Sequence, residues 1–465
     1  MTQATLSRAW VISLASLVFA GGLGYGLYTL YHNAPELIAR ANRIPTPPPP
    51  RGTLEAADGT PIATSTNDTV RLHPLGLSMS QVIGFGERAN GKGLSGLERD
   101  LQATLATGST VRLTLDPAVQ AIAEQALWKW LQASGSDWGT ALVMETRTGK
   151  LLAVANGPAF DPSAPRGNPQ TNISWRNHAF SVPIEPGSTM KALTAAVLLQ
   201  EGAATLDSRV DAPMWRKVGG WTINDVIQHP SVLTLREVLE YSSNVGISRL
   251  AERLPPDFLY NYMKKLHLAD GKPLPAVTVA EPKLRPLAKW GAIEYANATF
   301  GQGFLITPLH LTAAYNALAN NGVYLPPTLL EGQSVKGEPI FRPEVAQAIR
   351  TALGDNAEKI ARSAFLPGYY VGGKTGTAQV VINGRYSPSV FSALYAGFIP
   401  ADNPKVTVVV VFYHPKGERI HGAYIAAPVF HDIAAGLFAL WGIPPDFHRL
   451  DQLESRNKTG KLANR

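Results

Sequence analysis

Ser188 and Lys191 are the residues whose types and spacing point most directly to chemistry. They stand three positions apart where an apolar run begins, and the pattern predicts a helix that opens near Ser188 and ends before Gly202. Residues at i and i+3 share one face of a helix, so the hydroxyl and the amine are expected to lie side by side. A serine becomes a nucleophile beside a base, and a buried lysine can be that base because burial favours its neutral form.

The expected helix is apolar on every side, which is typical of a helix inside a domain. Its N-terminus supplies free backbone N–H groups and a positive dipole end, which favour an oxyanion near Ser188. In the alternative interpretation, Ser188 only caps the helix and Lys191 extends into solvent. A lone Ser-x-x-Lys arises by chance, so the catalytic interpretation requires partners elsewhere in the chain.

Ser242 and Asn244 are the first candidate partners. They lie in the segment Tyr241–Gly246, between two expected helices, and Thr234 to Glu237 forms a capping box that opens the first of these helices. From such a turn a hydroxyl can relay a proton and an amide can hold a peptide carbonyl. The alternative is an ordinary link between helices, with Asn244 as a cap.

The second candidate is the segment Lys374-Thr375-Gly376-Thr377, which is expected inside a strand. Glycine in a strand interior usually marks a close approach by a ligand or another backbone. One cation and two hydroxyls suit the binding of a carboxylate. The alternative is a bulged edge strand whose lysine is solvated.

Two other stretches show how little the short motifs mean without their context. Ser455 to Gly460 contains Ser-x-x-Lys, Ser-x-Asn and Lys-Thr-Gly overlapped, and Ser65-Thr66-Asn67 is another Ser-x-Asn. Neither belongs to a buried helix or an apolar strand, so we reject both. The elements that carry the motifs distinguish the set at Ser188, Ser242 and Lys374.

The expected strands lie before and after a mostly helical middle of the chain that contains Ser188 and Ser242. A last helix is expected from Pro428 to Trp441. One antiparallel sheet flanked by helices, an α/β (α+β) arrangement, is the simplest structure that accommodates this order. The expected strands are Gly139–Glu145, Leu151–Ala155, Tyr370–Ile382, Phe391–Phe398 and Val406–Phe412.

The N-terminus predicts a membrane anchor. Val11 to Leu30 is a stretch of about 20 residues without a charge, enough to cross a bilayer as a helix. A cleaved signal peptide is the alternative, although Ala39-Arg40-Ala41 is a poor cleavage site. A stiff Pro-rich spacer follows, with four consecutive prolines before Arg51.

Composition limits the remaining possibilities. The chain of 465 residues is 45% hydrophobic, carries a net charge of +7 and has no cysteine, so it forms no disulfide and no thiolate metal site. Its 10 histidines show no His-Glu-x-x-His spacing, and we expect no metal and no cofactor. We find no basic cluster with interleaved aromatics and expect no nucleic-acid partner.

Ser-x-x-Lys, Ser-x-Asn and Lys-Thr-Gly follow one another on helix, turn and strand, as in penicillin-binding proteins and class A β-lactamases. The chain resembles the class B penicillin-binding proteins, which are peptidoglycan D,D-transpeptidases, from about Arg51 to Asp446. Its closing stretch is most similar to the division-specific type, penicillin-binding protein 3. The residues in and around the motifs also resemble those of this family at Glu185–Thr189, Ser242–Gly246, Gly301–Gly303 and Gly373–Ala378.

The resemblance implies the penicillin-binding transpeptidase fold: a five-stranded antiparallel sheet flanked by helices, a helical subdomain, and one N-terminal transmembrane helix. It also implies a single-pass inner-membrane protein with a periplasmic catalytic domain that acts in division, cell-wall biogenesis and cell shape. The expected parts are a cytoplasmic N-terminus (1–10), an anchor (11–31), a Pro-rich linker (32–50), a reduced pedestal (51–110), the transpeptidase domain (111–450) and a flexible tail (451–465).

By the same resemblance, Ser188 attacks the carbonyl between the two terminal D-alanines of a stem peptide, and Lys191 takes its proton. Ser242 would pass the proton to the leaving D-alanine, and Asn244 would orient the donor peptide. An amine of a second stem peptide would then resolve the acyl-enzyme. β-Lactams would acylate Ser188 and remain attached.

The resemblance further implies that Lys374, Thr375, Gly376 and Thr377 hold the terminal carboxylate of the substrate. The backbone N–H groups of Ser188 and Thr377 would form the oxyanion hole. The expected partners are therefore stem peptides and β-lactam antibiotics, together with division-complex proteins. A membrane glycosyltransferase of the SEDS family would polymerise the glycan, because no glycosyltransferase domain is expected here.

Two alternatives stay open. Hydrolysis of the same bond, as in a D,D-carboxypeptidase or a β-lactamase, would use the same residues, because the acceptor alone distinguishes it from transfer. The second alternative is a non-enzymatic role. A β-lactam sensor would need a signalling domain, for which about ten expected cytoplasmic residues are too few, and a division scaffold could have lost its catalytic residues, yet every motif position is filled.

Overall fold

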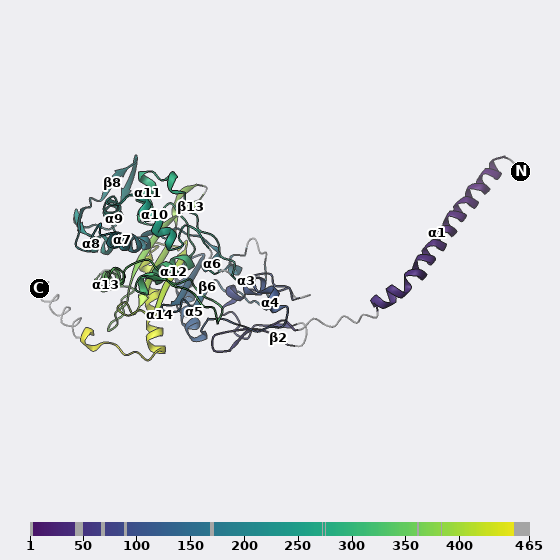
Figure 1. The fold of residues 1–465 in the computed structure, drawn as a ribbon, viewed down its shortest axis with the longest axis horizontal. Helices are drawn as coiled ribbons and strands as arrows, with labels where there is room; N and C mark the ends of the chain where they lie inside the picture. The colour runs from purple at the N-terminus through teal and green to yellow at the C-terminus, as the bar shows by residue number, and fades with distance from the viewer. Residues whose placement is uncertain are drawn as a thin grey trace. The chain divides into compact units, whose positions relative to one another are not determined.

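The described residues of the computed structural model are 3–41, 50–66, 70–87, 91–167, 172–271, 273–274, 276–359, 362–382 and 384–450. They fall into two units, drawn in Figure 1: an N-terminal helix, and a second unit that begins at Pro50. Each unit is described below by itself.

The first unit is the helix α1 (Gln3–Ala41). Within it, Ser13–Pro35 is apolar and long enough to span a membrane, and its large apolar side chains, such as Leu17 and Phe19, are exposed. A protein surface of this kind suits lipid rather than water. The helix continues past the expected end of the anchor at residue 31, whereas residues 42–49 of the expected linker lie outside the described residues.

A five-stranded sheet organises the second unit, and all its neighbouring strands are antiparallel. Strands from the N-terminal and C-terminal sides of the helical middle pair directly with one another, which confirms the predicted sheet built from both ends. Strand β13 lies at one edge, where its outer N–H and C=O groups have no strand beside them. The order is β13 (Gly372–Ile382), β14 (Arg385–Ile399), β15 (Val406–Tyr413), β5 (Trp138–Glu145) and β6 (Leu151–Gly157).

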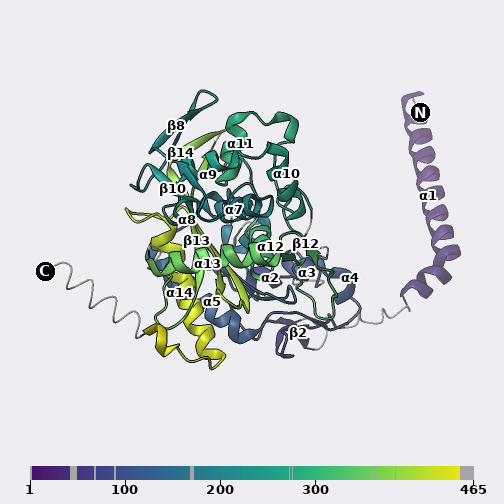
Figure 2. The ribbon, with the colours of Figure 1, turned by 60° about the vertical axis from the view of Figure 1, so that its left-hand side comes forward.

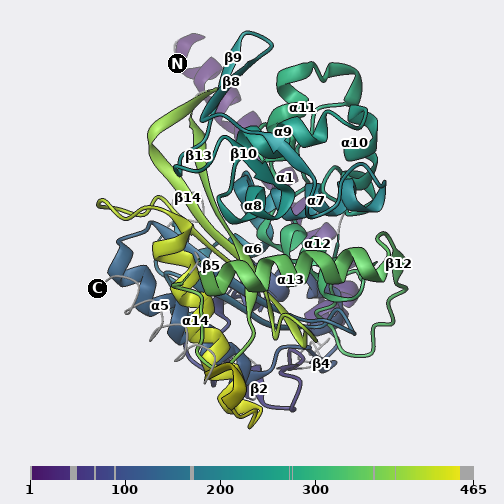
Figure 3. The same cartoon turned by 90° about the vertical axis from the view of Figure 1, so that its left-hand side faces the viewer.

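Alternation along the strands gives the sheet two buried faces. Helices α5 (Pro117–Ser134) and α14 (Gly422–Leu440) pack beside each other on one face, as Figure 3 shows. They cover Val408 and Val410 of β15, whereas Val409 and Val411 face the opposite core. Asp116 caps α5 by accepting from the N–H groups of Ala118 and Val119.

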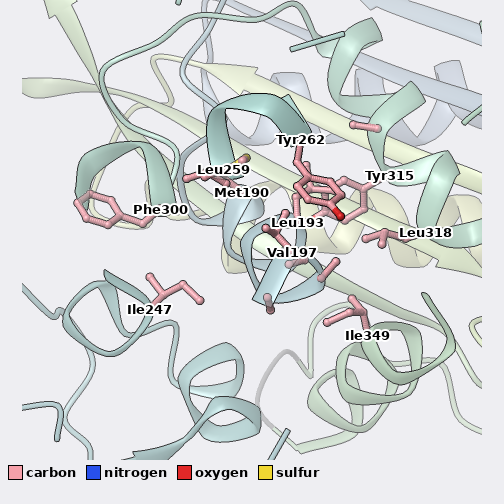
Figure 4. Close-up of a cluster of buried hydrophobic side chains, with 14 of the residues drawn as sticks. Met190, Leu193, Val197, Ile247, Leu259, Tyr262, Phe300, Tyr315, Leu318 and Ile349 are labelled. Carbon is pink, nitrogen blue, oxygen red and sulfur yellow. The ribbon is translucent and has the colours of Figure 1, made fainter. Parts of the chain in front are cut away.

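The helical subdomain packs around α7 (Met190–Gln200), which is buried on all sides. Figure 4 shows Leu193 and Val197 of this helix surrounded by apolar side chains from several other elements. Figure 2 shows the same helices gathered together. The helices of this part are α8 (Leu235–Glu240), α9 (Asn244–Ala251), α10 (Pro256–Lys265), α11 (Ala292–Thr299), α12 (Pro308–Ala319) and α13 (Pro343–Lys359).

One expectation about the elements was wrong: α14 begins at Gly422 rather than at Pro428. Proline is common at the first position of a helix, so Pro428 was mistaken for the first residue although it is inside α14. The mostly helical middle also contains elements that the sequence did not indicate: four short strands before α8, two more after α12, and two short helical turns before Ser188. The unexpected elements are β7 (Arg209–Asp211), β8 (Trp215–Val218), β9 (Trp221–Asn224), β10 (Val232–Thr234), η1 (Ile173–Trp175) and α6 (His178–Ser181).

Residues from Pro50 to about Thr110 form a small layer of strands and short helices whose apolar side chains join those of β5 and β6. Asp58-Gly59 makes the predicted turn between β1 and β2. The expected domain boundary at residue 110 stays a prediction. The elements here are β1 (Leu54–Glu55), β2 (Pro61–Thr66), β3 (Val70–Leu72), α2 (Ser80–Ile83), α3 (Gly96–Asp100), α4 (Gln102–Leu105) and β4 (Val111–Arg112). Two further short strands, β11 (Val323–Tyr324) and β12 (Glu338–Pro339), pair near the end of α12, and η3 (Leu287–Lys289) precedes α11.

Glu98 is fully buried in this layer and accepts from two arginines. Its two oxygens lie 2.5 Å from Arg51 Nε and 2.6 Å from Arg71 Nη2. Removing the carboxylate of a buried ion pair leaves cations without a counter-charge, which costs far more than losing a surface pair.

We therefore expect Glu98→Ala to lower the free energy of unfolding by roughly 3–5 kcal/mol. The matched control Glu55→Ala breaks the more exposed pair with Arg112 and should cost less than about 1 kcal/mol. Thermal unfolding of the detergent-solubilised full chain measures both variants. Equal losses for the two would contradict the assignment of a buried ion cluster.

Candidate active site

Ser188 lies in the short helical turn η2 (Gly187–Thr189), and α7 begins two residues later. Lys191 stands in the first turn of α7 with no exposed surface, and its Nζ lies 2.7 Å from Ser188 Oγ. The predicted pairing of these two side chains is therefore present. Lys191 does not extend into solvent, so the alternative interpretation of that residue was wrong.

Ser242 lies directly opposite Ser188, in the turn between α8 and α9. Its Oγ is 3.1 Å from Lys191 Nζ, and its carbonyl oxygen accepts from the same nitrogen at 2.7 Å. Its φ is 58°, in the left-handed region, which costs a residue other than glycine about 1–2 kcal/mol. Such conformations persist where the surrounding contacts fix the backbone.

Lys374 of β13 reaches the same hydroxyl from the other side. Its Nζ donates to Ser242 Oγ at 2.9 Å and to the carbonyl oxygen of Thr375 at 3.2 Å. The side chain is buried, so the alternative of a solvated lysine was wrong. Residues from α7, the α8–α9 turn and β13 thus meet at one hydroxyl, as the sequence predicted.

The two lysines are the electrostatic centre of the site. Burial lowers the pKa of Lys191 well below its usual range, the charge of Lys374 lowers this pKa further, and the carboxylate of Asp225 opposes the shift. Burial also lowers the pKa of Lys374, to about 7. Two ammonium ions beside one hydroxyl would repel each other. We therefore assign the neutral amine to Lys191, whose pKa is lowered by burial and also by the charge of Lys374.

Thr375 and Thr377 stand two residues apart in β13, so their side chains face the same side of the sheet. Thr377 Oγ1 accepts from the N–H of Gly422 at 3.1 Å, which leaves its O–H proton to be donated. Gly376 lies against the turn of Ser188: an added Cβ would be 3.1 Å from the carbonyl oxygen of Pro186. The strand can pass this close to the nucleophile because glycine has no side chain.

Asn244 is the first residue of α9, and its side-chain nitrogen donates to the carbonyl oxygen of Asn224 at 2.8 Å. The cap of this helix is Ser243, which accepts from the N–H of Gly246, so the alternative of Asn244 as a cap was wrong. Asp225 accepts from the backbone N–H groups of Asn244 and Val245. Sequence reasoning missed Asp225, because an aspartate so far along the chain from Ser242 carries no local signal.

Glu185 is a second residue whose place the sequence did not indicate. Its Oε1 accepts from the N–H of Gly303 at 2.9 Å and from the hydroxyl of Tyr386 at 3.0 Å. Its second oxygen is buried without a hydrogen-bond partner among the described residues. Burial raises the pKa of Glu185 to about 7, although both hydrogen bonds oppose the shift. An acidic residue beside Pro186-Gly187 and close to an apolar helix was the available signal.

Parts of both rejected motifs, the tail from Ser455 to Gly460 and Asn67 of the stray Ser-x-Asn, lie outside the described residues, so their rejection stays a prediction. Across the described parts of the chain, no group of three or more His, Cys, Asp or Glu side chains could hold a metal ion, and we assign no metal ligand.

The family model of the penicillin-binding protein transpeptidase domain matches residues 139–435. The chain belongs to this family. The matched range contains all of the sheet except Trp138, together with each of the three predicted motifs, so the resemblance inferred from those motifs is confirmed.

Two similar proteins carry names that fit this family. The probable peptidoglycan D,D-transpeptidase PenA of Neisseria meningitidis is 32% identical over 411 residues, which cover 81% of this chain and 69% of PenA. The peptidoglycan D,D-transpeptidase FtsI of Escherichia coli K12 is 32% identical over 342 residues, which cover 72% of this chain and 57% of FtsI.

Solved structures give the same result for the fold. Penicillin-binding protein 3 of Mycobacterium tuberculosis superimposes with a TM-score of 0.80 at 30% identity, covering 86% of this chain and 97% of that one. The same protein has been solved in complex with aztreonam, at a TM-score of 0.79, and with ampicillin, at 0.78. The predicted fold and the similarity to the penicillin-binding protein 3 type are confirmed.

The raised pKa of Glu185 predicts how the stability of this family member depends on pH. The folded state holds the proton up to about pH 7, whereas the unfolded chain releases it near 4.5, so stability falls as pH rises between these values. We expect Glu185→Gln to remove this fall, which amounts to roughly 3 kcal/mol at most.

Thermal unfolding of wild type and Glu185→Gln between pH 4.5 and 8 measures this difference. The exposed Glu344→Gln is the matched control and should follow wild type throughout. Parallel curves for wild type and Glu185→Gln would show that folding leaves the pKa of Glu185 unchanged, which would contradict the rise caused by burial.

Proposed function

We propose that this chain is a serine-type peptidoglycan D,D-transpeptidase that cross-links stem peptides in cell-wall synthesis and is inhibited by β-lactams. The observation that carries the proposal is the 2.7 Å approach of a fully buried lysine amine to Ser188 Oγ. The peptidoglycan D,D-transpeptidase names of the relatives and the β-lactam complexes of the similar structure support it.

In the first half-reaction, Ser188 Oγ attacks the carbonyl carbon of the penultimate D-alanine while its proton passes to Lys191 Nζ. The tetrahedral oxyanion accepts from the backbone N–H groups of Ser188 and Thr377, which the close approach of β13 to the Ser188 turn brings together. When the C–N bond breaks, the proton moves from Lys191 through Ser242 to the leaving amine. This short path exists because Ser242 Oγ is 3.1 Å from Lys191 Nζ.

The terminal carboxylate of the donor peptide is held by Lys374 together with the hydroxyls of Thr375 and Thr377. Lys374 approaches Ser242 and supplies the positive charge, while Thr377 keeps an O–H proton to donate. Gly376 lets the peptide backbone lie along the free edge of β13, where strand-like hydrogen bonds are available. Asn244 orients the donor peptide from the opposite wall.

In the second half-reaction, an amine of another stem peptide attacks the ester carbonyl of the acyl-enzyme. The new amide forms, the C–O bond to Ser188 breaks, and Ser188 regains a proton from the attacking amine through Lys191. Hydrolysis by a D,D-carboxypeptidase or β-lactamase would use water as the acceptor at the same residues. No contact in the site favours water over an amine, and the transpeptidase relatives favour transfer.

The apolar helix Ser13–Pro35 suits a single membrane anchor. We propose that the second unit stands on the periplasmic side of the inner membrane, where the stem peptides are, and acts in septal synthesis, as the name FtsI suggests for one relative. A SEDS-family glycosyltransferase and division-complex proteins are the partners that this placement requires. A scaffold without catalysis would have no use for a buried, neutral lysine beside a serine.

Covalent labelling by a fluorescent penicillin tests the nucleophile. The detergent-solubilised full chain should carry a label that survives denaturing electrophoresis, and Ser188→Ala should abolish it because no acyl ester can form. Ser455→Ala, in the rejected tail motif, is the matched control and should label like wild type. Label retained by Ser188→Ala would sink the assignment, and a folded wild type without label would favour the scaffold.

Lys191→Arg tests the base. Arginine cannot release its proton in a protein, so it places a permanent cation where Lys191 is a neutral amine, and the acylation rate constant should fall by roughly 100- to 10,000-fold. In wild type the acylation rate should decline as pH falls, because protonation occupies the lone pair of Lys191. Stopped-flow acylation by the same penicillin measures both effects.

The surface variant Lys129→Arg, which keeps its contact with Asp432, is the matched control and should acylate normally. An acylation rate for Lys191→Arg within tenfold of wild type would show that another group removes the proton.

A further inference from the structure

The segment that follows β9 lies directly behind the turn of Ser242. Within it, Asp225 and His229 are four residues apart, and Asp225 Oδ2 lies 2.9 Å from His229 Nε2. The side chains expose only 1% and 0% of their surfaces. A buried carboxylate and imidazole in contact require a reason, because their desolvation is unfavourable unless good partners surround them.

Asp225 has a full set of partners, and three of them belong to the turn of Ser242. Its Oδ1 accepts from the N–H groups of Asn244 at 2.5 Å and Val245 at 3.1 Å, and its Oδ2 accepts from Ser243 Oγ at 2.5 Å. The two N–H groups begin α9, where no preceding turn of helix can pair with them. A carboxylate at this end of a helix also opposes the helix dipole favourably.

These contacts fix the backbone directly after Ser242. Ser242 itself holds a positive φ and carries the hydroxyl that both lysines approach, so its position depends on the residues on either side. Lys191 holds its carbonyl oxygen at 2.7 Å, and Asp225 holds the three residues that follow. A shift of this turn would move Ser242 Oγ away from the proton path.

His229 is placed to keep Asp225 in its orientation. Its Nδ1 lies 2.8 Å from the carbonyl oxygen of Pro230, and its Nε2 faces Asp225 Oδ2. Both contacts of the ring are with oxygen atoms, so the imidazole is held between the backbone of its own segment and Asp225. The ring also packs at a tilt against Tyr241, 5.9 Å between centroids, one residue before Ser242.

We propose that Asp225 and His229 form a positioning pair that holds the Ser242–Asn244 turn in its reactive conformation for acyl transfer. The inference rests on the proposed function, since it assigns these residues to the same reaction. Neither residue touches Ser188, so neither is a catalytic residue: Asp225 acts through the turn, and His229 acts through Asp225. The carboxylate also faces Lys191, which Lys374 approaches from β13 as the opposing charge.

Two substitutions separate positioning from a general loss of structure. Asp225→Asn keeps the shape of the side chain and removes its charge, and His229→Gln keeps a donor and removes the ring that holds Asp225. We expect each to lower the limiting acylation rate constant by about 10- to 100-fold, because a small displacement of Ser242 is costly to the reaction. The dissociation constant of the initial penicillin complex should stay within about threefold of wild type, since the carboxylate site on β13 is unchanged.

The pH profile of acylation supplies a readout that a purely structural role would not move. Asp225 stabilises the protonated form of Lys191, so Asp225→Asn should shift the acid limb of the profile to lower pH. His229→Gln loosens Asp225 without removing its carboxylate, so it should shift the limb in the same direction by a smaller amount. Unequal shifts of one sign follow from a carboxylate that is held behind Lys191 by the ring.

Stopped-flow acylation of the detergent-solubilised full chain by the fluorescent penicillin measures the rate constant, the dissociation constant and the pH profile. Asp432→Asn and His431→Gln, on the distant helix α14, are the matched controls and should behave as wild type. Thermal unfolding of each sample gives the folded fraction, and His229→Gln tests the pair independently if Asp225→Asn does not fold. Unchanged rate constants in both folded variants, or acid limbs that do not move, would overturn the inference, whereas absence of label on wild type would overturn the proposed function instead.

Discussion

The structure depends on keeping two lysine amines away from water around one serine hydroxyl. Lys191 and Lys374 are both buried and reach Ser242 Oγ from opposite sides at 3.1 and 2.9 Å. Burying an amine disfavours its charged form, and a second cation nearby disfavours it further. The neutral base that Ser188 requires is thus a consequence of position, since the same lysine on a surface helix would be an ammonium ion.

The fold meets this requirement by placing the amines between the helical core and the edge of the sheet. Helix α7 is surrounded by apolar side chains, so Lys191 enters the site from a helix enclosed by the subdomain. Lys374 comes from β13, which lies close to the Ser188 turn because Gly376 has no side chain. Gly422 serves the same purpose behind the strand, where an added Cβ would be 2.4 Å from the carbonyl oxygen of Gly376. Close packing on both sides of β13 therefore determines the distance from Lys374 to Ser242.

The sequence predicted those parts of the fold and site whose signals are local. The five strands follow from apolar runs, and the start of α8 follows from the capping box Thr234 to Glu237. The three motifs were recognised because each lies on the type of element that its chemistry needs. The short strands β7 to β10 were missed, because three or four residues between turns leave too little periodicity to detect. Asp225 and Glu185 were missed as parts of the site for a different reason. The residues that each of them contacts are far away along the chain, so no short stretch of sequence reveals these contacts.

The charges of the site also explain why an anionic ligand belongs there. On the proposed function, the terminal carboxylate of the substrate lies beside Lys374, whose pKa burial lowers to about 7. A carboxylate at that position favours the ammonium form of Lys374. A charged Lys374 in turn lowers the pKa of Lys191, so the substrate itself holds the base in its neutral form when Ser188 must lose its proton. The carboxylate of Asp225 raises the pKa of Lys191 instead. Because Asp225 lies behind the turn rather than beside Ser188, it can orient Ser242 without making Lys191 a permanent cation. The buried carboxylate of Asp225 and the bound carboxylate of the substrate therefore determine, by their positions, whether Lys191 or Lys374 is charged at each step.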